Sequence, residues 1–371
     1  MNKETLEKLK NEDFNDGYYH FRKDVEMYPD ATIYIIWSKR GPGKTYSTIR
    51  YYLAEEQKFI YLKRTAHDAE MITNDFAQIV GSDFSPMAPL NEDFGMNIRS
   101  EVVDKKSGLG AFLERFEDGG IADTHGLIGA LNVVKSYKGV NYRPYKAIIL
   151  DEFIPQLGEI VRKDEGEMLL NFQPTVERNR TNEGEPPVKI VLLSNTDQIS
   201  TSITNTLGIV NEMLELTNSN ETHMYLEDRK ILLHHIKSWE VPSTDDINSG
   251  MYEVMQGTPW FFKTFEGLFA GNDFSKVKKM DLKGFKPYCS FLHQGKMNYV
   301  YINSQGIYYI TFSRFSKGPG NFYDLTIESD QKLFWYNERA RIADACIKGR
   351  AYFEKYTMYD VIMNYKNFFK V

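Results

Sequence analysis

Residues 32–45 read TIYIIWSKRGPGKT, and they give the clearest indication of the fold. Its first six residues are β-branched, aliphatic or aromatic, which is typical of a strand buried on both faces in a parallel sheet. A Gly-Pro-Gly turn follows, and residues 46–57 are expected to form a helix. A buried strand, a glycine-rich turn and a helix, in that order, predict a loop that binds phosphate at a helix N-terminus.

The turn nearly matches the Walker A pattern of Gly, four residues and Gly-Lys-Ser/Thr, with Ser38 standing at the first glycine. We expect backbone N–H groups near the glycines to converge on phosphate oxygens, with Lys44 reaching the β- and γ-phosphates and Thr45 binding Mg²⁺. The alternative is a Gly-Pro-Gly turn that precedes Lys-Thr by chance. The residues predicted to contact the nucleotide are Ser38, Lys39, Arg40, Gly41, Pro42, Gly43, Lys44 and Thr45.

A second hydrophobic strand ends in two carboxylates, since residues 147–152 read AIILDE. This pattern predicts a Walker B element in which Asp151 holds Mg²⁺ through water and Glu152 orients, or accepts a proton from, the attacking water. A neighbouring glutamate indicates a hydrolytic motor and not a kinase. Residues 195–197, NTD, lack the lysine of a guanine-reading element. ATP is therefore the expected nucleotide.

Four further candidate residues carry weaker signals. Asn195 follows the strand at 189–193, where a polar side chain of a motor ATPase senses the γ-phosphate; the alternative is a residue that merely ends the strand. Arg178 and Arg180 lie shortly before that strand and could reach a neighbouring subunit's nucleotide, or be ordinary surface charge. Lys138 precedes the Walker B strand, and a solvated lysine is its default interpretation.

Four buried strands separated by helices predict an open, mostly parallel α/β sheet. The strands are expected at 32–37, 58–62, 147–150 and 189–193. The predicted domains are an ATPase domain at 1–238, a linker at 239–275 and a small α+β domain at 276–371 that contains a hairpin at 297–312.

The charge is divided unevenly along the 371 residues. The whole chain carries 45 Lys and Arg against 51 Asp and Glu, a net of −6. Residues 276–371 hold 16 basic and 8 acidic residues, a net of +8, which leaves −14 for residues 1–275. The basic end suits an anionic partner such as a nucleic acid.

The two cysteines, Cys289 and Cys346, exclude a disulfide framework and are expected to be free thiols. The polar start lacks the apolar segment of a signal peptide, and no stretch approaches 18 uninterrupted apolar residues. We therefore expect a soluble intracellular protein with no membrane partner.

Four blocks taken in order resemble the DNA-packaging ATPases of phi29-type short-tailed bacteriophages, which belong to the additional-strand catalytic-Glu class of P-loop NTPases. The blocks are WSKRGPGKTYS, FIYLKR, ILDEFI and TVERNR with the following VLLSN. The resemblance implies a homomeric ring, a pentamer in these phages, that threads double-stranded DNA into a procapsid using ATP. It also implies the phage portal and a structural packaging RNA as partners, and a location in the host cytoplasm with transient attachment to the procapsid.

The resemblance assigns a role to each matched position. Arg178 becomes a finger given to the neighbouring subunit, Lys138 a second lysine acting across that interface, and Arg40 a switch that couples nucleotide state to subunit contact. The family's proposed DNA-contacting lysine has no clear counterpart, because Ala66 stands near that position with Lys63 and Arg64 close by.

The family's C-terminal domain resembles a ribonuclease H-like nuclease that has lost its chemistry. An active version needs several carboxylates around two metals, and residues 283–323 contain no acid. We therefore interpret the basic domain as catalytically inactive. Two competing hypotheses are a terminase-like protein with a working metal-dependent nuclease and an interaction protein whose nucleotide site regulates assembly.

Overall fold

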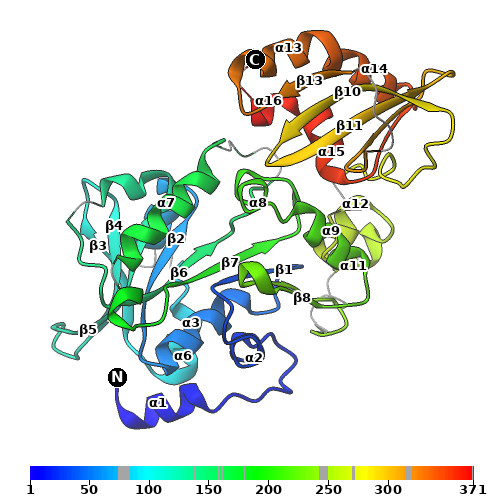
Figure 1. The fold of residues 1–371 in the computed structure, drawn as a ribbon. Helices are drawn as coiled ribbons and strands as arrows, with labels where there is room; N and C mark the ends of the chain where they lie inside the picture. The colour runs from blue at the N-terminus through cyan, green and yellow to red at the C-terminus, as the bar shows by residue number, and fades with distance from the viewer. Residues whose placement is uncertain are drawn as a thin grey trace. The chain divides into compact units, whose positions relative to one another are not determined.

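The computed structural model describes residues 1–73, 84–137, 139–156, 159, 162–178, 180–241, 250–269, 272–314, 320–369 and 371 (Figure 1). Two compact units emerge from its contacts. The first contains Met1–Ile203 and Glu215–Gly271, and the second contains Thr204–Leu214 and Asn272–Val371.

The first unit is built on a nine-stranded sheet with the order β3-β4-β5-β2-β6-β7-β1-β9-β8. The strands from β5 to β9 in this order are all parallel, while β3 and β4 at one edge and β8 at the other are antiparallel to their neighbours. The predicted mostly parallel α/β sheet is therefore confirmed. The strands are β1 (Ile33–Ser38), β2 (Lys58–Lys63), β3 (Ile98–Asp104), β4 (Leu109–Arg115), β5 (Ile121–Ala130), β6 (Tyr145–Asp151), β7 (Lys189–Asn195), β8 (His223–Leu226) and β9 (Ile231–His235).

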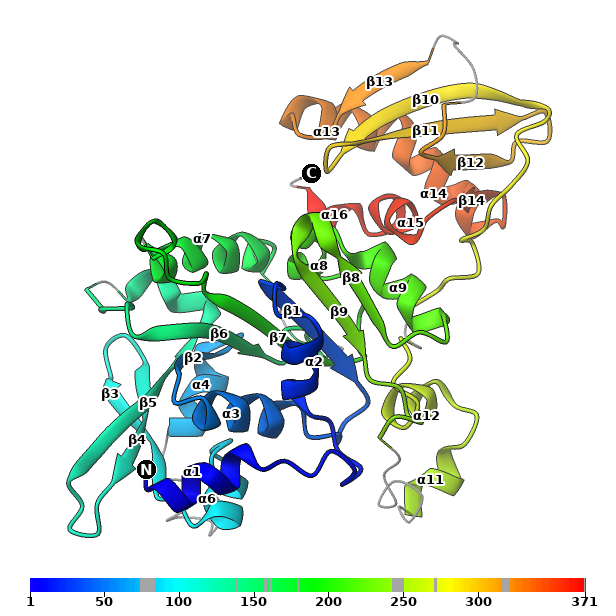
Figure 2. The same cartoon turned by 60° about the horizontal axis from the view of Figure 1, so that its bottom comes forward.

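Helices cover both faces of this sheet, which explains why its central strands are apolar on both sides. Tyr34 and Ile36 pack into a core with Ile49 and Leu53 of α3, whereas the alternate residues Ile35 and Trp37 are buried outside that cluster. Figure 2 shows α1 and α3 on one side of β1 and β6, with α7 on the other. The helices of this unit include α1 (Lys3–Lys10), α2 (Phe21–Met27), α3 (Lys44–Ala54), α4 (Ala66–Thr73), α6 (Ala88–Phe94), α7 (Glu165–Glu177), α11 (Gly250–Met255) and α12 (Pro259–Thr264), with 3₁₀ turns at Leu131–Ser136, Thr181–Glu183 and Glu227–Arg229.

The second unit has a mixed five-stranded sheet with the order β13-β10-β11-β12-β14. β11 and β12 pair in antiparallel fashion, which confirms the predicted hairpin. Cys289 and Cys346 are buried as free thiols in its core, as expected. The elements are β10 (Phe285–His293), β11 (Lys296–Asn303), β12 (Tyr308–Thr311), β13 (Asn321–Asp324), β14 (Ala351–Phe353), α13 (Glu328–Phe334), a π-helical turn (Trp335–Arg339), α14 (Ala340–Ile347), α15 (Tyr356–Met363) and α16 (Tyr365–Phe368).

The chain crosses between the units at places that the sequence did not indicate. The segment Thr204–Leu214, which includes parts of α8 (Ser202–Leu207) and α9 (Val210–Asn218), groups with the second unit. Residues 239–269 group with the first unit, although the sequence predicts a separate linker there. The assignment of functions to 1–238, 239–275 and 276–371 stays a prediction.

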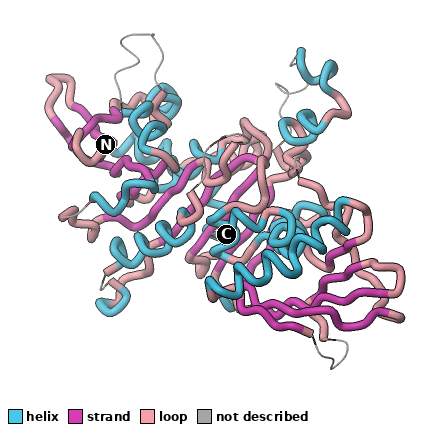
Figure 3. The backbone as a smooth tube through the Cα atoms, turned by 90° about the horizontal axis from the view of Figure 1, so that it is seen from above, coloured by secondary structure: helices cyan, strands magenta, loops and turns pink. Residues whose placement is uncertain are grey.

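Figure 3 shows the strands of each sheet running side by side. Within the described residues, no helix combines the length and apolar character needed to cross a bilayer.

Candidate nucleotide site

The predicted phosphate loop connects the end of β1 to the start of α3. Gly41 and Gly43 have φ of +91° and +89°, a left-handed conformation that strains other residues. Gly43 is the N-cap of α3, so the N–H groups of the first turn and the helix dipole face the loop. The local fold therefore provides an anion-binding helix N-terminus. Arg40 is exposed in this loop, whereas Lys39 is buried.

Lys44 joins three parts of the site through its buried ammonium group. Its Nζ donates hydrogen bonds to Ser38 Oγ at 2.6 Å, to the Lys39 carbonyl at 3.1 Å and to Asn195 Oδ1 at 3.2 Å. Burial lowers the pKa of Lys44 to about 7. Ser38, which departs from the Walker A glycine, thus supplies an acceptor for the lysine. Asn195, at the end of β7, lies within hydrogen-bond distance of the lysine.

Asp151 ends β6 beside the start of α3. Thr45 Oγ1 donates to its Oδ1 at 3.1 Å, Tyr61 OH donates to its Oδ2 at 2.6 Å, and Lys63 Nζ lies 3.0 Å from the same oxygen. Burial alone would raise the pKa of Asp151, but Lys63 and the hydrogen bonds outweigh it and hold the pKa below its ordinary value. The oxygens of Thr45 and Asp151 are hard ligands, and as a donor set they fit Mg²⁺.

Glu152 follows in a left-handed backbone conformation with φ of +57°. Such a conformation is costly for a residue with a side chain and persists where neighbouring structure enforces it. Here the next turn is tied to β7, because the Ile154 N–H donates to Ser194 Oγ at 3.1 Å. The Glu152 side chain is half exposed, with one oxygen 3.1 Å from Lys63 Nζ. The carboxylate is therefore open to solvent and held beside Asp151.

Lys63 and Arg64 contact carboxylates of their own chain. The sequence placed both residues close to the position of the family's DNA-contacting lysine and did not indicate these carboxylate contacts. Lys63 lies between the two Walker B acids, and Arg64 is buried in ion pairs with Glu159 and Glu165. Lys63 ends β2, and β2 pairs with β6, so only the strand order reveals this contact. The cleft here has a volume of about 100 Å³ and is lined by Lys63, Arg64, Asp68, Asp151, Glu152, Ile154, Gln156, Glu159, Ser194, Asn195 and Asp197.

The two candidate arginines differ in environment. Arg180 is buried, and its Nη2 donates to the carbonyls of Arg143 and Tyr145, each at 2.7 Å. Arg178 is exposed at the end of α7, with Nη2 3.4 Å from the Val140 carbonyl. Arg180 is therefore held by contacts within its own chain, whereas Arg178 faces solvent.

Arg178 lies at the opposite edge of the sheet from Lys44. α7 starts at Glu165, which pairs with Arg64 at the carboxyl edge, and ends where Arg180 contacts Tyr145, the first residue of β6. Its 13 residues span about 20 Å at 1.5 Å per residue. The structure therefore does not bring Arg178 to the nucleotide loop of its own chain. Lys138 lies outside the described residues.

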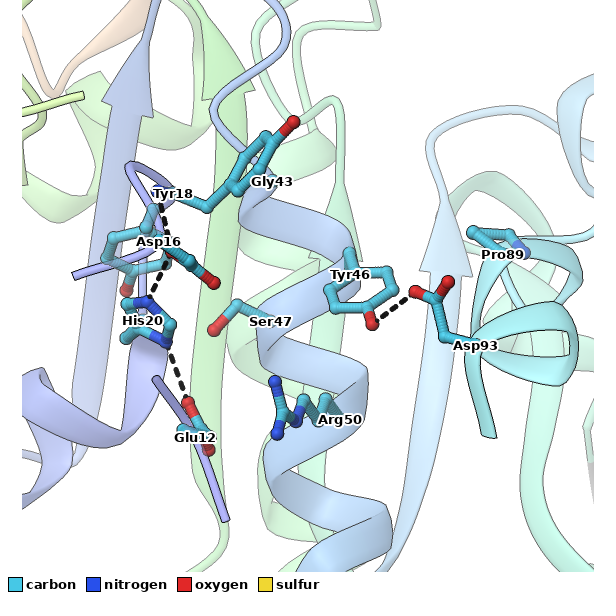
Figure 4. A pocket seen from close by; sticks show the side chains of 11 residues that line it. Glu12, Asp16, Tyr18, His20, Gly43, Tyr46, Ser47, Arg50, Pro89 and Asp93 are labelled. Atoms are coloured by element: carbon cyan, nitrogen blue, oxygen red, sulfur yellow. Dashed lines mark hydrogen bonds and ion pairs between the residues drawn. The ribbon is translucent and has the colours of Figure 1, made fainter. Parts of the chain in front are cut away.

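A larger cavity of about 450 Å³ opens beside the start of α3, on the side of the N-terminal segment (Figure 4). Tyr18 and Tyr46 provide aromatic walls, and Tyr46 OH donates to Asp93 at 2.6 Å. The Tyr19 N–H donates to the Pro42 carbonyl at 2.9 Å, which ties this segment to the phosphate loop. The sequence motifs gave no signal for this cavity. Its lining residues are Glu12, Asp16, Tyr18, Tyr19, His20, Gly43, Tyr46, Ser47, Arg50, Pro89 and Asp93.

The segment predicted as a linker packs against the back of the phosphate loop. Gly267 has φ of +66°, and a Cβ placed on it would lie only 2.8 Å from the Lys39 nitrogen. His235 Nε2 is 3.0 Å from the Gly267 carbonyl, and the His235 ring stacks on Trp37 with centroids 5.3 Å apart. Gly267 is therefore a positioning residue for the loop.

No protein-family model matches the chain, and no curated protein matches it. Solved structures do. The chain is similar to the Phi-28 gp11 DNA packaging motor, with 15% sequence identity and a TM-score of 0.59, over 96% of this chain and 99% of that chain. It is also similar to a chain of the bacteriophage Phi-29 viral genome packaging motor assembly, with 19% identity and a TM-score of 0.63, over 95% and 99% of the two chains.

The chain shares the fold of these packaging-motor proteins. The similarity extends over both units, since each match covers nearly the full length of both chains.

Proposed function

We propose that this chain is the ATPase of a viral genome-packaging motor, which hydrolyses ATP and moves double-stranded DNA into a procapsid. The observation that carries the proposal is the convergence of Lys44, Asp151, Glu152 and Asn195 at one sheet edge in a chain with the fold of packaging motors. β7 stands between β1 and β6, as the additional strand of the catalytic-Glu class would. The arrangement supports ATP hydrolysis as the source of work.

The nucleotide phosphates would lie on the loop of residues 38–45. Lys44 would pair with the β- and γ-phosphates, while Thr45 and Asp151 would hold Mg²⁺. The bound ion would neutralise charge on the phosphate oxygens. Glu152, half exposed beside Asp151, would orient the attacking water or accept its proton. Asn195 would respond to loss of the γ-phosphate, because its amide oxygen already contacts Lys44.

The nucleobase would occupy the cavity beside α3. Tyr18 and Tyr46 offer faces for stacking, and the cavity borders Gly43 and Ser47, next to the phosphate loop. A purine would thereby lie within one nucleotide's length of Lys44. The carboxylates of Asp16 and Asp93, on opposite sides of the cavity (Figure 4), are hydrogen-bond acceptors and suit the amino group of adenine better than the carbonyl of guanine.

A homomeric ring would complete the site. Arg178 is exposed and lies at the sheet edge away from its own Lys44, so a nucleotide that it contacts would belong to a neighbouring subunit. A guanidinium supplied in this way offsets charge on the transferring phosphoryl. We propose Arg178 as this group, Lys138 as a second lysine that acts across the interface, Arg40 as the loop residue that senses the contact, and a pentamer as the ring.

The second unit would bind nucleic acid without cutting it. Its main segment is basic, and β10, β11 and β12 contain no acid. Among the described residues, the single group of three potential metal ligands lies in the first unit. These features favour a ribonuclease H-like module without nuclease activity over a terminase-like nuclease. Its partners would be the packaged DNA, or a structural packaging RNA at the portal.

Nuclease protection tests the proposal. Procapsids of the virus that encodes this chain would be mixed with its DNA, the purified protein and ATP, and then treated with DNase. We expect full-length protected DNA with the wild type and none with Lys44→Ala. The alternative result is a wild type that hydrolyses ATP at a rate that DNA does not raise, and that protects no DNA. That result would support a nucleotide-regulated assembly protein. Metal-dependent cutting of plasmid DNA would support the nuclease hypothesis.

A further inference from the structure

A second cluster of chemically active side chains lies away from the phosphate loop, at the β8 edge of the large sheet. Asp24 comes from α2, His223 begins β8 and His234 lies in β9. One potential ligand atom from each residue lies within 4.8 Å of the others. Asp24 and His234 are buried and His223 is partly exposed. Residues about 200 positions apart in the chain thus meet at one point.

The distances within the cluster suit a shared ion. Asp24 Oδ1 is 3.1 Å from His223 Nε2, and Asp24 Oδ2 is 2.8 Å from His234 Nδ1. Two ligands of a tetrahedral zinc ion, each bound at about 2.0 Å, are separated by roughly 3.3 Å. The two imidazole rings are tilted by 30° to each other, with centroids 3.8 Å apart. This places both ring nitrogens on the same carboxylate.

Two of the three residues, His223 and Asp24, make further hydrogen bonds of the kind that orient metal ligands. His223 Nδ1 is 2.8 Å from Thr222 Oγ1, and Tyr19 OH donates to Asp24 Oδ2 at 2.7 Å. His234 Nε2 is buried without a hydrogen-bond partner among the described residues, and Glu240 is 3.8 Å away. Outer contacts of this type fix the ring orientation of a metal-bound histidine.

We propose that Asp24, His223 and His234 bind a divalent transition metal of the zinc type, with water as the fourth ligand. Two nitrogens and one carboxylate oxygen suit zinc, whereas Mg²⁺ and Ca²⁺ prefer sites made only of oxygens. The His223 side chain is 18% exposed, which leaves a route for the water and for entry of the ion. The metal clips α2 to β8 and β9, so its binding stabilises the folded chain.

Metal content is the first measurement. The full chain would be stripped with a chelator, dialysed against zinc in excess Mg²⁺, desalted and analysed by mass spectrometry for metals. We expect one zinc per chain, and the same preparation loaded with Co²⁺ should show the visible absorption bands of a tetrahedral site. A wild-type chain that retains no zinc and gives no cobalt spectrum would overturn the proposal and indicate that the cluster shares only protons.

Variants locate the ion. His223→Ala removes the partly exposed ligand, and His67→Ala removes an exposed histidine of α4 outside the cluster. We expect zinc affinity to fall at least about tenfold in the first variant and to stay unchanged in the second. Equal zinc binding by both variants would contradict the assignment. If His223→Ala does not fold, a rise in the wild-type Tm on adding zinc, reversed by chelator, supports the site, and no rise counts against it.

Discussion

Lys63 Nζ lies 3.0 Å from the carboxylate of Asp151, and it lies 3.1 Å from Glu152 as well. The ammonium group therefore balances the two Walker B acids, in the place where a divalent ion would also be attracted. Lys63 is half-buried and Asp151 is buried, so the pair is less screened by water than a surface ion pair.

Removing this cation should make the fold depend on Mg²⁺. In Lys63→Met, we expect the free energy of unfolding without Mg²⁺ to fall by about 3 kcal/mol, because a buried charge loses its partner. Mg²⁺ should then raise the Tm more than in the wild type. Lys58→Met is the matched control, since Lys58 lies on the same strand but pairs with the exposed Asp123. The same response to Mg²⁺ in both variants would contradict the assigned role of Lys63.

Substitutions of the two arginines near the end of α7 should have different effects, one on ATPase activity and the other on stability. Arg178→Ala removes an exposed side chain, so we expect a change in stability within about 0.5 kcal/mol but a loss of ATPase activity of about 10³-fold. Arg180→Ala breaks hydrogen bonds to two backbone carbonyls, one buried and one partly buried, and should cost about 1–3 kcal/mol. Urea unfolding and steady-state ATP hydrolysis measure both effects. A stable, fully active Arg178→Ala protein would rule out the finger.

Gly267 should be intolerant of a side chain for a steric reason. Gly267→Ala introduces a Cβ 2.8 Å from the Lys39 nitrogen, whereas a Cβ at Gly257, which also has positive φ, meets no atom within 4 Å. Both alanine variants should lose about 1 kcal/mol or more from backbone strain. Only Gly267→Ala should also weaken binding of a fluorescent ATP analogue. Equal affinities in the two variants would argue against contact between this segment and the loop.

His20 should make stability depend on pH. Burial alone would lower its pKa, but Glu12 and Asp16, at 2.9 and 3.0 Å, outweigh burial and raise the pKa above 6.5. The folded chain therefore holds this proton more tightly than the unfolded chain. The resulting stabilisation is fully present below pH 6.5 and is lost as the pH rises through the folded-state pKa.

The measurement compares the wild type with His20→Gln by urea unfolding from about pH 6 to about pH 9, the range in which a histidine with a raised pKa loses its proton. We expect the difference in free energy of unfolding to shrink with increasing pH. His67→Gln, at an exposed position, should show no such trend. If the difference in free energy of unfolding stays constant or grows with pH, the protonated form of His20 is not stabilised in the folded chain.

Features encoded by neighbouring residues were predictable from the sequence. The apolar run 32–37, the glycines after it and the acids after 147–150 are local signals, and β1, the loop and β6 follow them. Contacts that depend on the order of strands in the sheet were not predictable from the sequence. Lys63 reaches Asp151 only because β2 pairs with β6, and Gly267 reaches Lys39 from a segment with no periodic pattern. The buried state of Arg180 likewise depends on carbonyls at the start of β6.

Substitution of Glu152 should reduce ATP hydrolysis without reducing nucleotide binding. Glu152→Gln keeps the size of the side chain but removes the base, so ATP turnover should fall by about 10²- to 10⁴-fold while nucleotide affinity stays close to the wild-type value. Lys44→Ala should instead lose affinity, because it removes a phosphate contact. Equilibrium binding and turnover measured on the same preparations distinguish these outcomes. A Glu152→Gln protein with unchanged turnover would remove Glu152 from the chemistry.

Mixing two inactive variants tests most directly whether this chain is a ring ATPase that completes its site between subunits. Arg178→Ala subunits keep Glu152, and Glu152→Gln subunits keep Arg178, so mixed rings contain interfaces with one intact pair. The measurement is steady-state ATP hydrolysis across mixing ratios at constant total protein. We predict activity well above that of either variant alone and greatest at intermediate ratios; no recovery at any ratio, with mixed assembly verified, would contradict a site completed between subunits.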